Sequence, residues 1–193
     1  TVLVRDARLV GHNTDWTGFA AGLSSGLPQA DLSRVVLLGS GGAGSAVAYA
    51  VLRAGAARLD VVDLDPDRAA DRVAALTPLF PAATVASAGP DRLPALLDGA
   101  TGLVHATPVG MHHHPGLPID PQLLSPRLWV ADVVYRPVRT RLVMAAEERG
   151  CRVLDGGHMA VGQAVDTFRL ITGVEPARDR MRAHFLSLVA SGR

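Results

Sequence analysis

Short, mostly apolar runs alternate with longer amphipathic stretches along most of this chain. Runs of strand length stand at residues 35–38, 59–62, 102–106, 129–134 and 152–154, with a weaker one at 84–86. Runs with so little polar alternation are typical of a parallel sheet that is buried on both faces. The stretches between them carry apolar residues at helical spacing, which predicts helices up to about residue 54 and over 67–76, 92–97, 140–149, 159–171 and 177–189.

Strand and helix alternate strictly from residue 34 onward. That order implies right-handed βαβ crossovers and an α/β fold, a doubly wound, mostly parallel sheet of the Rossmann type. The first residues follow another pattern, because 2–5 and 8–10 are short β-rich runs joined by a two-residue turn, which predicts a hairpin. A helix from residue 16 follows, and we expect a boundary between two parts of the chain in the turn at 26–33.

The composition is that of a globular protein with balanced charge. The chain has 193 residues, 48% of them hydrophobic and 19% charged, with a net charge of +1. These values argue against a disordered tail and against a basic arm that binds nucleic acid. No apolar run approaches the roughly 18 residues of a membrane span, and no secretory leader opens the sequence. Because Cys151 stands alone, a disulfide framework is also excluded, and we expect a cytoplasmic protein.

The basic residues are all arginine. The sequence has 19 lysines and arginines together, and none of them is lysine. This chain therefore cannot itself supply a Schiff-base lysine, a phosphate-binding lysine of the Walker type or a lysine that donates a proton.

A glycine-rich loop, Gly39-x-Gly41-x-x-Gly44, leaves the first buried strand and opens the next helix. In this context the first glycine permits a tight turn and the second lets the backbone approach a pyrophosphate. The third allows the helix to pack closely on the strand, and the helix N-terminus attracts the phosphate charge. The loop predicts a dinucleotide site, although a tight turn without a ligand would use the same glycines.

An acidic residue, Asp63, ends the second strand of the same unit. A carboxylate there accepts hydrogen bonds from an adenosine ribose and repels a 2′-phosphate. Leu64 follows where a basic residue would favour NADP, so NAD is the expected cofactor. Arg68 lies one helical turn further on and keeps NADP open as the alternative.

Three polar residues outside the loop have ordinary structural interpretations. Asp15 is suited to cap a helix that begins at Trp16. Tyr135 is suited to pack at a strand end, and Gln163 to lie on a helix surface. Gln163 nevertheless shares a mostly apolar side with Met159, where an unpaired amide would cost roughly 1–3 kcal/mol, so a ligand is the expected partner.

Five motifs in a fixed order resemble the shikimate/quinate dehydrogenase family, from about Val10 to the C-terminus. They are Gly11-His12-Asn13-Thr14-Asp15, Gly39-Ser40-Gly41-Gly42-Ala43-Gly44, Ala106-Thr107-Pro108-Val109-Gly110-Met111, Asp132-Val133-Val134-Tyr135 and Gly156-x-x-Met159-x-x-x-Gln163-Ala164. The resemblance implies that Asp15 is the catalytic carboxylate, which holds a substrate hydroxyl beside a lysine that serves as general acid and base. In that family the lysine lies upstream, in an N-terminal substrate domain.

The resemblance also assigns the remaining site residues. Tyr135 and Gln163 match side chains that point at substrate. Asp63-Leu64-Asp65 is similar to the branch that uses NAD. The positions expected to line the cofactor are Gly39, Ser40, Gly41, Gly42, Ala43, Asp63, Leu64, Arg68, Ala106, Thr107, Pro108, Val109, Met111, Val133, Gly156 and Met159.

The predicted activity is hydride transfer between a ring secondary alcohol and a nicotinamide. The expected partner is a small cyclic hydroxy acid, shikimate or quinate, with no nucleic acid and no membrane, and a homodimer stays open. We expect the tail of a substrate domain at 1–15, a connecting helix and linker at 16–33, a dinucleotide-binding domain at 34–175 and a C-terminal helix at 176–193 that packs back toward the substrate domain. The alternatives are a dinucleotide-binding or regulatory module without chemistry of its own, and another two-domain dehydrogenase, such as the methylene-tetrahydrofolate type.

Two histidine features depart from the family pattern. His105 stands where the family usually has asparagine before Ala-Thr. Three consecutive histidines, 112–114, have no role that the resemblance assigns. Because no cysteine or second cluster would complete a tetrahedral set, we expect a solvated loop near the cofactor cleft and no metal.

Overall fold

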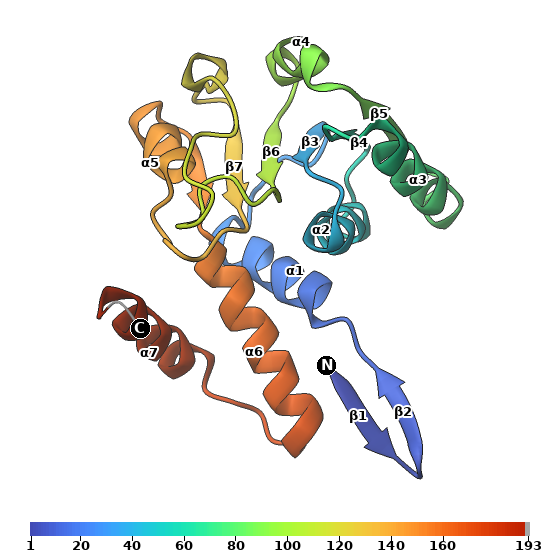
Figure 1. The fold of residues 1–193 in the computed structure, drawn as a ribbon, viewed down its shortest axis with the longest axis vertical. Coiled ribbons are helices and arrows are strands. Elements are labelled where there is room, and N and C mark those ends of the chain that lie inside the picture. The colour runs from blue at the N-terminus through green and yellow to red at the C-terminus, as the bar shows by residue number, and fades with distance from the viewer. Residues whose placement is uncertain (192–193) are drawn as a thin grey trace.

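The computed structural model describes residues 1–191 and contains two sheets (Figure 1). The larger sheet has six parallel strands in the order β5-β4-β3-β6-β7-β8. These strands are β3 (Val35–Leu38), β4 (Arg58–Val62), β5 (Thr84–Ala88), β6 (Gly102–His105), β7 (Trp129–Asp132) and β8 (Arg152–Leu154). The predicted α/β, doubly wound, Rossmann-type fold is confirmed.

Helices cover both faces of this sheet. They are α1 (Thr14–Gly26), α2 (Gly42–Arg53), α3 (Pro66–Leu76), α4 (Leu93–Asp98), α5 (Arg141–Glu148), α6 (Gly156–Thr172) and α7 (Arg178–Ala190), with short 3-10 helices η1 (Thr77–Leu79), η2 (Pro90–Arg92) and η3 (Pro121–Leu123). Alternate residues of β3 point into separate cores. Val35 and Leu37 pack with α1, α2 and α3, whereas Val36 and Leu38 pack with α4 and α5. Burial on both faces explains why the strands are apolar throughout.

The strand order reverses direction at β3. The chain moves outward from β3 through β4 to β5 and then returns to the other side of β3 as β6. In open α/β sheets the crevice at such a reversal, outside the carboxyl ends of the strands, is where ligands bind. Gly39 follows β3 and Ala106 follows β6, so both residues lie at this crevice.

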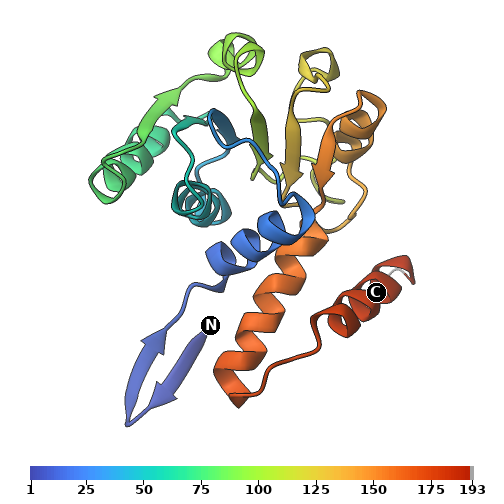
Figure 2. The same cartoon turned by 180° about the vertical axis from the view of Figure 1, so that it is seen from behind.

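The N-terminal hairpin stands away from the sheet. Strands β1 (Val2–Arg5) and β2 (Arg8–Gly11) are antiparallel, and the turn residues Asp6 and Ala7 have φ of 49° and 59°. Positive φ at both central residues matches the twist of a two-residue hairpin. Figure 2 shows the hairpin beyond the N-terminal end of α1. The hydroxyl of Thr1 lies 2.8 Å from the hydroxyl of Thr167 on α6.

The structure corrects the predicted start of α1. The helix begins at Thr14, and its cap is Asn13, whose side-chain oxygen accepts from the backbone N–H of Asp15 at 3.0 Å and of Trp16 at 3.4 Å. The expectation that Asp15 caps this helix is therefore wrong. Asp15 lies in the first turn instead, with its carboxylate available to other partners.

The C-terminal helix α7 lies along α6, and none of its described residues is buried. Its expected packing toward a substrate domain stays a prediction. In residues 1–191, no helix combines the length and the apolar character that crossing a membrane requires.

Candidate active site

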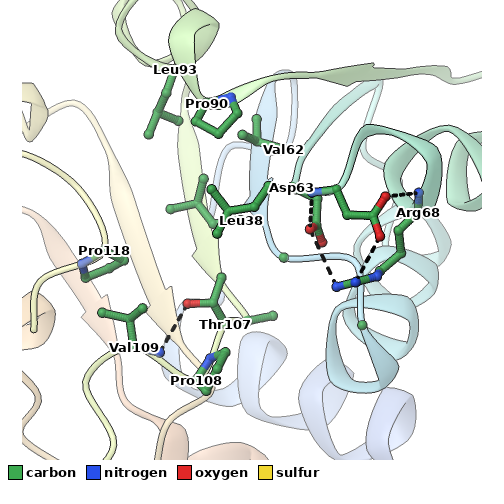
Figure 3. A pocket seen from close by; sticks show the side chains of 15 residues that line it. Leu38, Val62, Asp63, Arg68, Pro90, Leu93, Thr107, Pro108, Val109 and Pro118 are labelled. Atoms are coloured by element: carbon green, nitrogen blue, oxygen red, sulfur yellow. Dashed lines mark hydrogen bonds and ion pairs between the residues drawn. The ribbon is translucent and has the colours of Figure 1, made fainter. Parts of the chain in front are cut away.

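A cavity of about 570 Å³ opens at the carboxyl ends of β3, β4 and β6 (Figure 3). It lies at the point where the strand order reverses. Its lining residues are Leu38, Gly39, Gly41, Val62, Asp63, Leu64, Asp65, Arg68, Pro90, Leu93, Ala106, Thr107, Pro108, Val109 and Pro118.

The glycine loop forms one edge of this cavity and is shaped by contacts that exclude side chains. Gly39 has a φ of +91°, and a Cβ there would lie 2.8 Å from the Ala106 carbonyl oxygen. A Cβ on Gly44 would overlap the Gly39 carbonyl. At Gly41 and Gly42, in contrast, no described atom lies within 4 Å of the Cβ position, so the backbone there is open to a ligand.

The N-terminus of α2 meets the same loop. No side chain caps it, because Gly41 occupies the cap position. The first N–H groups of a helix have no partner within the helix, and they carry the positive end of its dipole. Such an uncapped terminus next to open glycine backbone can bind a phosphate.

Asp63 lies beside the glycine loop at the end of β4 and holds this rim of the cavity in place. Its carboxylate accepts hydrogen bonds of 2.7 Å from the backbone N–H and from the hydroxyl of Ser40, and one of 3.0 Å from the N–H of Asp65. Burial acts to raise the pKa of Asp63, but these hydrogen bonds and the Arg68 guanidinium prevail and lower it below the ordinary aspartate value. Asp63 is therefore an ionised acceptor at neutral pH.

The two neighbours of Asp63 at this rim differ in exposure. Leu64 is 90% exposed. The Arg68 guanidinium lies 3.0 Å from the Asp65 carboxylate and 3.6 Å from that of Asp63, and half of its side chain is exposed (Figure 3). Asp63 and Asp65 thus partly neutralise the cation nearest to this end of the cavity.

The segment after β6 forms the facing wall. The Thr107 hydroxyl accepts from the backbone N–H of Val109 at 3.3 Å and lies 2.6 Å from Nε2 of His105. Nδ1 of that imidazole lies 2.9 Å from the Asp132 carboxylate at the end of β7, and both side chains are fully buried. The wall is therefore connected to the sheet interior by side-chain hydrogen bonds.

A second polar centre lies where α1 crosses α6. The Gln163 amide donates a 2.8 Å hydrogen bond to the Asp15 carboxylate. Backbones approach closely here, since a Cβ on Gly18 would lie 2.6 Å from the N atom of Gln163 and a Cβ on Gly162 would lie 2.6 Å from the Gly18 carbonyl oxygen. The amide of Gln163 thus has a partner in Asp15, another side chain that the resemblance assigned to substrate, and the ligand expected for Gln163 stays a prediction.

Several predicted cofactor residues do line the cavity, and others lie outside it. Those outside are Ser40, Gly42, Ala43, Met111, Val133, Gly156 and Met159. Met159 is buried in the core, while Gly156 packs against the carbonyl of Val134, where a Cβ would overlap it. Roles for these residues toward a cofactor stay predictions.

The sequence analysis missed an apolar part of the lining. Pro90 follows β5, Leu93 begins α4, and Pro118 comes from the loop after β6. Pro90 had a usable signal, since it closely follows a predicted strand and the carboxyl ends of parallel strands share one edge. Pro118 had none, because a long loop can fold over either side of that edge.

The remaining singled-out residues lie on the surface. Tyr135 is partly exposed, with its ring 6.3 Å from that of Phe185 on α7. Residues 112–114 form an exposed turn, in which the N–H of Gly110 donates to the His114 carbonyl at 2.7 Å. Among residues 1–191, no group of three histidine, cysteine, aspartate or glutamate side chains is placed to hold a metal ion.

Comparisons with known proteins agree with this geometry. The chain is 60% identical over 191 residues to a shikimate dehydrogenase (NADP(+)) of Arthrobacter sp. (strain FB24), with 99% of this chain and 65% of the relative covered. It is 48% identical over 187 residues to a quinate/shikimate dehydrogenase (NAD(+)) of Corynebacterium efficiens, with 97% and 66% covered. The chain thus spans about two thirds of the length of these curated relatives.

A solved structure gives the same result. The quinate dehydrogenase of Corynebacterium glutamicum in complex with NAD superposes with a TM-score of 0.92 at 45% identity, with 97% of this chain and 67% of that chain covered. A scan of protein-family models finds no match to this chain. With the fold, the ordered motifs and these relatives in agreement, the chain belongs to the shikimate/quinate dehydrogenase family.

Proposed function

We propose that this chain binds a nicotinamide dinucleotide in its 570 Å³ cavity and is the cofactor-binding part of a shikimate or quinate dehydrogenase. The observation that carries the proposal is the meeting of three features at one crevice. The open glycine backbone, the uncapped N-terminus of α2 and the ionised Asp63 all border the cavity. Together they suit a pyrophosphate between two nucleosides.

NAD is the preferred cofactor in this proposal. Asp63 offers a carboxylate to ribose hydroxyls and repels a 2′-phosphate, and the exposed Leu64 adds no cation. The names of the relatives do not decide the matter, because one at 60% identity is named for NADP and one at 48% for NAD. Among the residues that line the cavity Arg68 is the one cation, and Asp63 and Asp65 already hold it.

The Asp15–Gln163 pair is the proposed contribution to substrate binding and catalysis. The side-chain amide N–H of Gln163 donates to Asp15, which leaves the side-chain oxygen of Gln163 to accept from a substrate hydroxyl. Asp15 would hold a ring hydroxyl so that the carbinol carbon faces the nicotinamide, with Tyr135 at the edge of the same site. The alcohol loses hydride to the cofactor and its proton to a base.

That base is not in this chain, since the sequence has no lysine. In the proposed division, residues 1–15 belong to a substrate domain and residues 16–33 connect it to the dinucleotide-binding domain at 34–175. Residues 176–193 pack back toward the substrate domain. α1 begins at Thr14, so Asp15 sits on the connecting helix itself. By this proposal the 193 residues alone bind cofactor without turning over substrate.

Titration of the 193-residue chain with NADH and NADPH, followed by nicotinamide fluorescence, tests the binding proposal. Saturable binding with NADH at least about tenfold tighter is expected, which corresponds to roughly 1.4 kcal/mol. Absence of binding to either dinucleotide contradicts the proposal, and tighter binding of NADPH contradicts the argument from Asp63.

A chimaera tests the catalytic proposal. The N-terminal third of the Arthrobacter relative is fused before Thr1, and oxidation of shikimate and of quinate is measured with each dinucleotide. Activity in the chimaera but not in the 193 residues is expected, and Asp15→Asn should abolish it while leaving NADH affinity unchanged. An inactive chimaera that still binds NADH would favour a binding module without chemistry of its own.

A further inference from the structure

A chain of buried polar side chains runs from the sheet interior to the cavity wall, and it takes no part in the proposed hydride transfer. The Asp132 carboxyl group accepts from the backbone N–H of Val134 at 3.0 Å and from the hydroxyl of Thr140 at 2.6 Å, and it lies 2.9 Å from Nδ1 of His105. His105, Asp132 and Thr140 are each at least 98% buried. Buried polar groups persist only when their partners are in place.

The hydrogen-bond partners favour one placement of the protons. Val134 and Thr140 each donate to a different oxygen of Asp132, so Asp132 is the acceptor of this cluster, and a proton on Nδ1 of His105 gives the third contact a donor. Within the described residues, Oγ1 of Thr107 has two partners, Nε2 of His105 and the N–H of Val109. The N–H can only donate, so Nε2 is the acceptor available for the Thr107 hydroxyl proton.

We propose that His105 is a positioning residue, neutral and protonated on Nδ1, that holds the Thr107 hydroxyl and thereby sets the cavity wall for the dinucleotide. The order of bonds is Thr107 O–H to His105 Nε2, then His105 Nδ1–H to Asp132. With its proton committed to His105, Thr107 turns its oxygen lone pairs toward the Val109 N–H and the cavity. This inference rests on the proposed dinucleotide site.

Thr107 is held from a second side by the glycine loop. A Cβ on Gly39 would lie 2.9 Å from the Thr107 methyl group and 2.8 Å from the Ala106 carbonyl oxygen. The loop and the wall segment are therefore packed together, and a shift of Thr107 displaces the surface that faces the pyrophosphate. The hydrogen bond that Thr107 donates to His105 in this proposal restrains that contact.

The connection from Asp132 through His105 to Thr107 depends on the length of the histidine side chain. An asparagine at position 105 places its polar atoms about where Nδ1 stands, so it can reach Asp132 but not Thr107. His105→Asn thus satisfies the buried carboxylate and removes only the bond to Thr107. Thr107→Val removes the same bond from the other end with little change in volume.

The proton positions are read without any cofactor. In the free chain labelled with ¹⁵N, the ring nitrogens of His105 are observed by NMR and assigned by loss of their signals in His105→Asn. A proton on Nδ1 and none on Nε2 is expected. A proton on Nε2, alone or together with one on Nδ1, overturns the proposal whether or not NADH binds.

The positioning role is tested by a double-mutant cycle on NADH affinity. His105→Asn and Thr107→Val should each weaken binding about three- to tenfold. The double variant should be no weaker than Thr107→Val, which also removes the acceptor of the Val109 N–H. Thr107→Ser keeps the hydroxyl and should restore most of the affinity. Losses that multiply in the double variant, or unchanged affinity in both single variants, overturn the proposal.

A matched control separates this effect from general destabilisation. Thr101 lies just before β6, at the other end of the strand, where its hydroxyl donates to the Asp31 carbonyl at 2.8 Å. Thr101→Val should lower the melting temperature without changing NADH affinity. A fall in affinity in Thr101→Val equal to that in Thr107→Val would show a global effect and contradict the positioning role. Failure of the unsubstituted chain to bind NADH would instead contradict the proposed function, and the NMR measurement would still decide the assignment.

Discussion

The Gln163 amide donates a 2.8 Å hydrogen bond to the Asp15 carboxylate across 148 positions of sequence. The contact exists because α1 and α6 cross at Gly18 and Gly162, where the backbones nearly touch (Figures 1 and 2). With Asn13 as the cap of α1, Asp15 has no capping duty and is free to accept from Gln163. Two small residues in one helix pair thus bring together two of the three side chains that the family resemblance assigned to substrate.

Gly162→Ala should force α1 and α6 apart. The added Cβ would lie 2.6 Å from the Gly18 carbonyl oxygen, which is backbone and cannot move aside alone. The expected loss in the free energy of unfolding is about 1–3 kcal/mol, measured by chemical denaturation. Gly11→Ala is the control, since no described atom lies within 4 Å of its Cβ position. An equal effect at both sites would contradict the helix-crossing explanation.

Gln163→Glu should place two carboxylates in contact and destabilise the chain at neutral pH. The lost hydrogen bond and the like-charge contact should cost about 1–3 kcal/mol of unfolding free energy at pH 7. The loss should shrink on acidification, as the pair takes up a proton. Asp15→Asn in the same chain should recover much of the stability, because the new amide can donate to Glu at 163. Wild-type stability for Gln163→Glu at pH 7 would contradict the hydrogen bond.

Leu64→Arg should shift cofactor preference toward NADP. Leu64 lines the cavity beside Asp63 and is 90% exposed, so a guanidinium there can reach a 2′-phosphate without burial. The ratio of the two dissociation constants, from NADH and NADPH fluorescence titrations, should change by about tenfold or more. Leu79→Arg is the matched control, because Leu79 is also exposed but lies outside the cavity. An unchanged ratio in Leu64→Arg would remove this rim from the specificity argument.

Asp63 should contribute stability that disappears in acid. Its pKa is lower in the folded chain than the ordinary aspartate value, so the unfolded state binds the proton more tightly. The contribution is therefore complete well above about pH 4 and is lost as the pH falls through the folded pKa. The difference in unfolding free energy between wild type and Asp63→Asn should be largest near pH 6 and shrink below about pH 4. If the difference in unfolding free energy between wild type and Asp63→Asn instead grows on acidification, the pKa of Asp63 is raised in the folded chain. That result would refute the hydrogen bonds from Ser40 to Asp63.

Local pattern was enough for most of the elements. The apolar runs predicted every strand of the large sheet and the alternation predicted its parallel order, because burial on both faces leaves a direct trace in the sequence. The glycine loop was found for a similar reason, since its spacing reflects a local turn. Helix starts were less accurate, and α6 begins at Gly156 rather than at 159, because glycines at 156 and 157 resemble a turn.

Tertiary structure decided the partners of polar groups, which no local pattern encodes. From sequence, Asp15 was suited to a cap and His105 was an unexplained substitution, yet one accepts from Gln163 and the other joins Asp132 to Thr107. The sequence by itself determined the strands of the sheet, the glycine loop and the resemblance to the family, and it showed that none of these 193 residues is a lysine. Only the folded chain determined which distant side chains meet, because a hydrogen bond depends on the positions of two helices or strands and not on the residues between them.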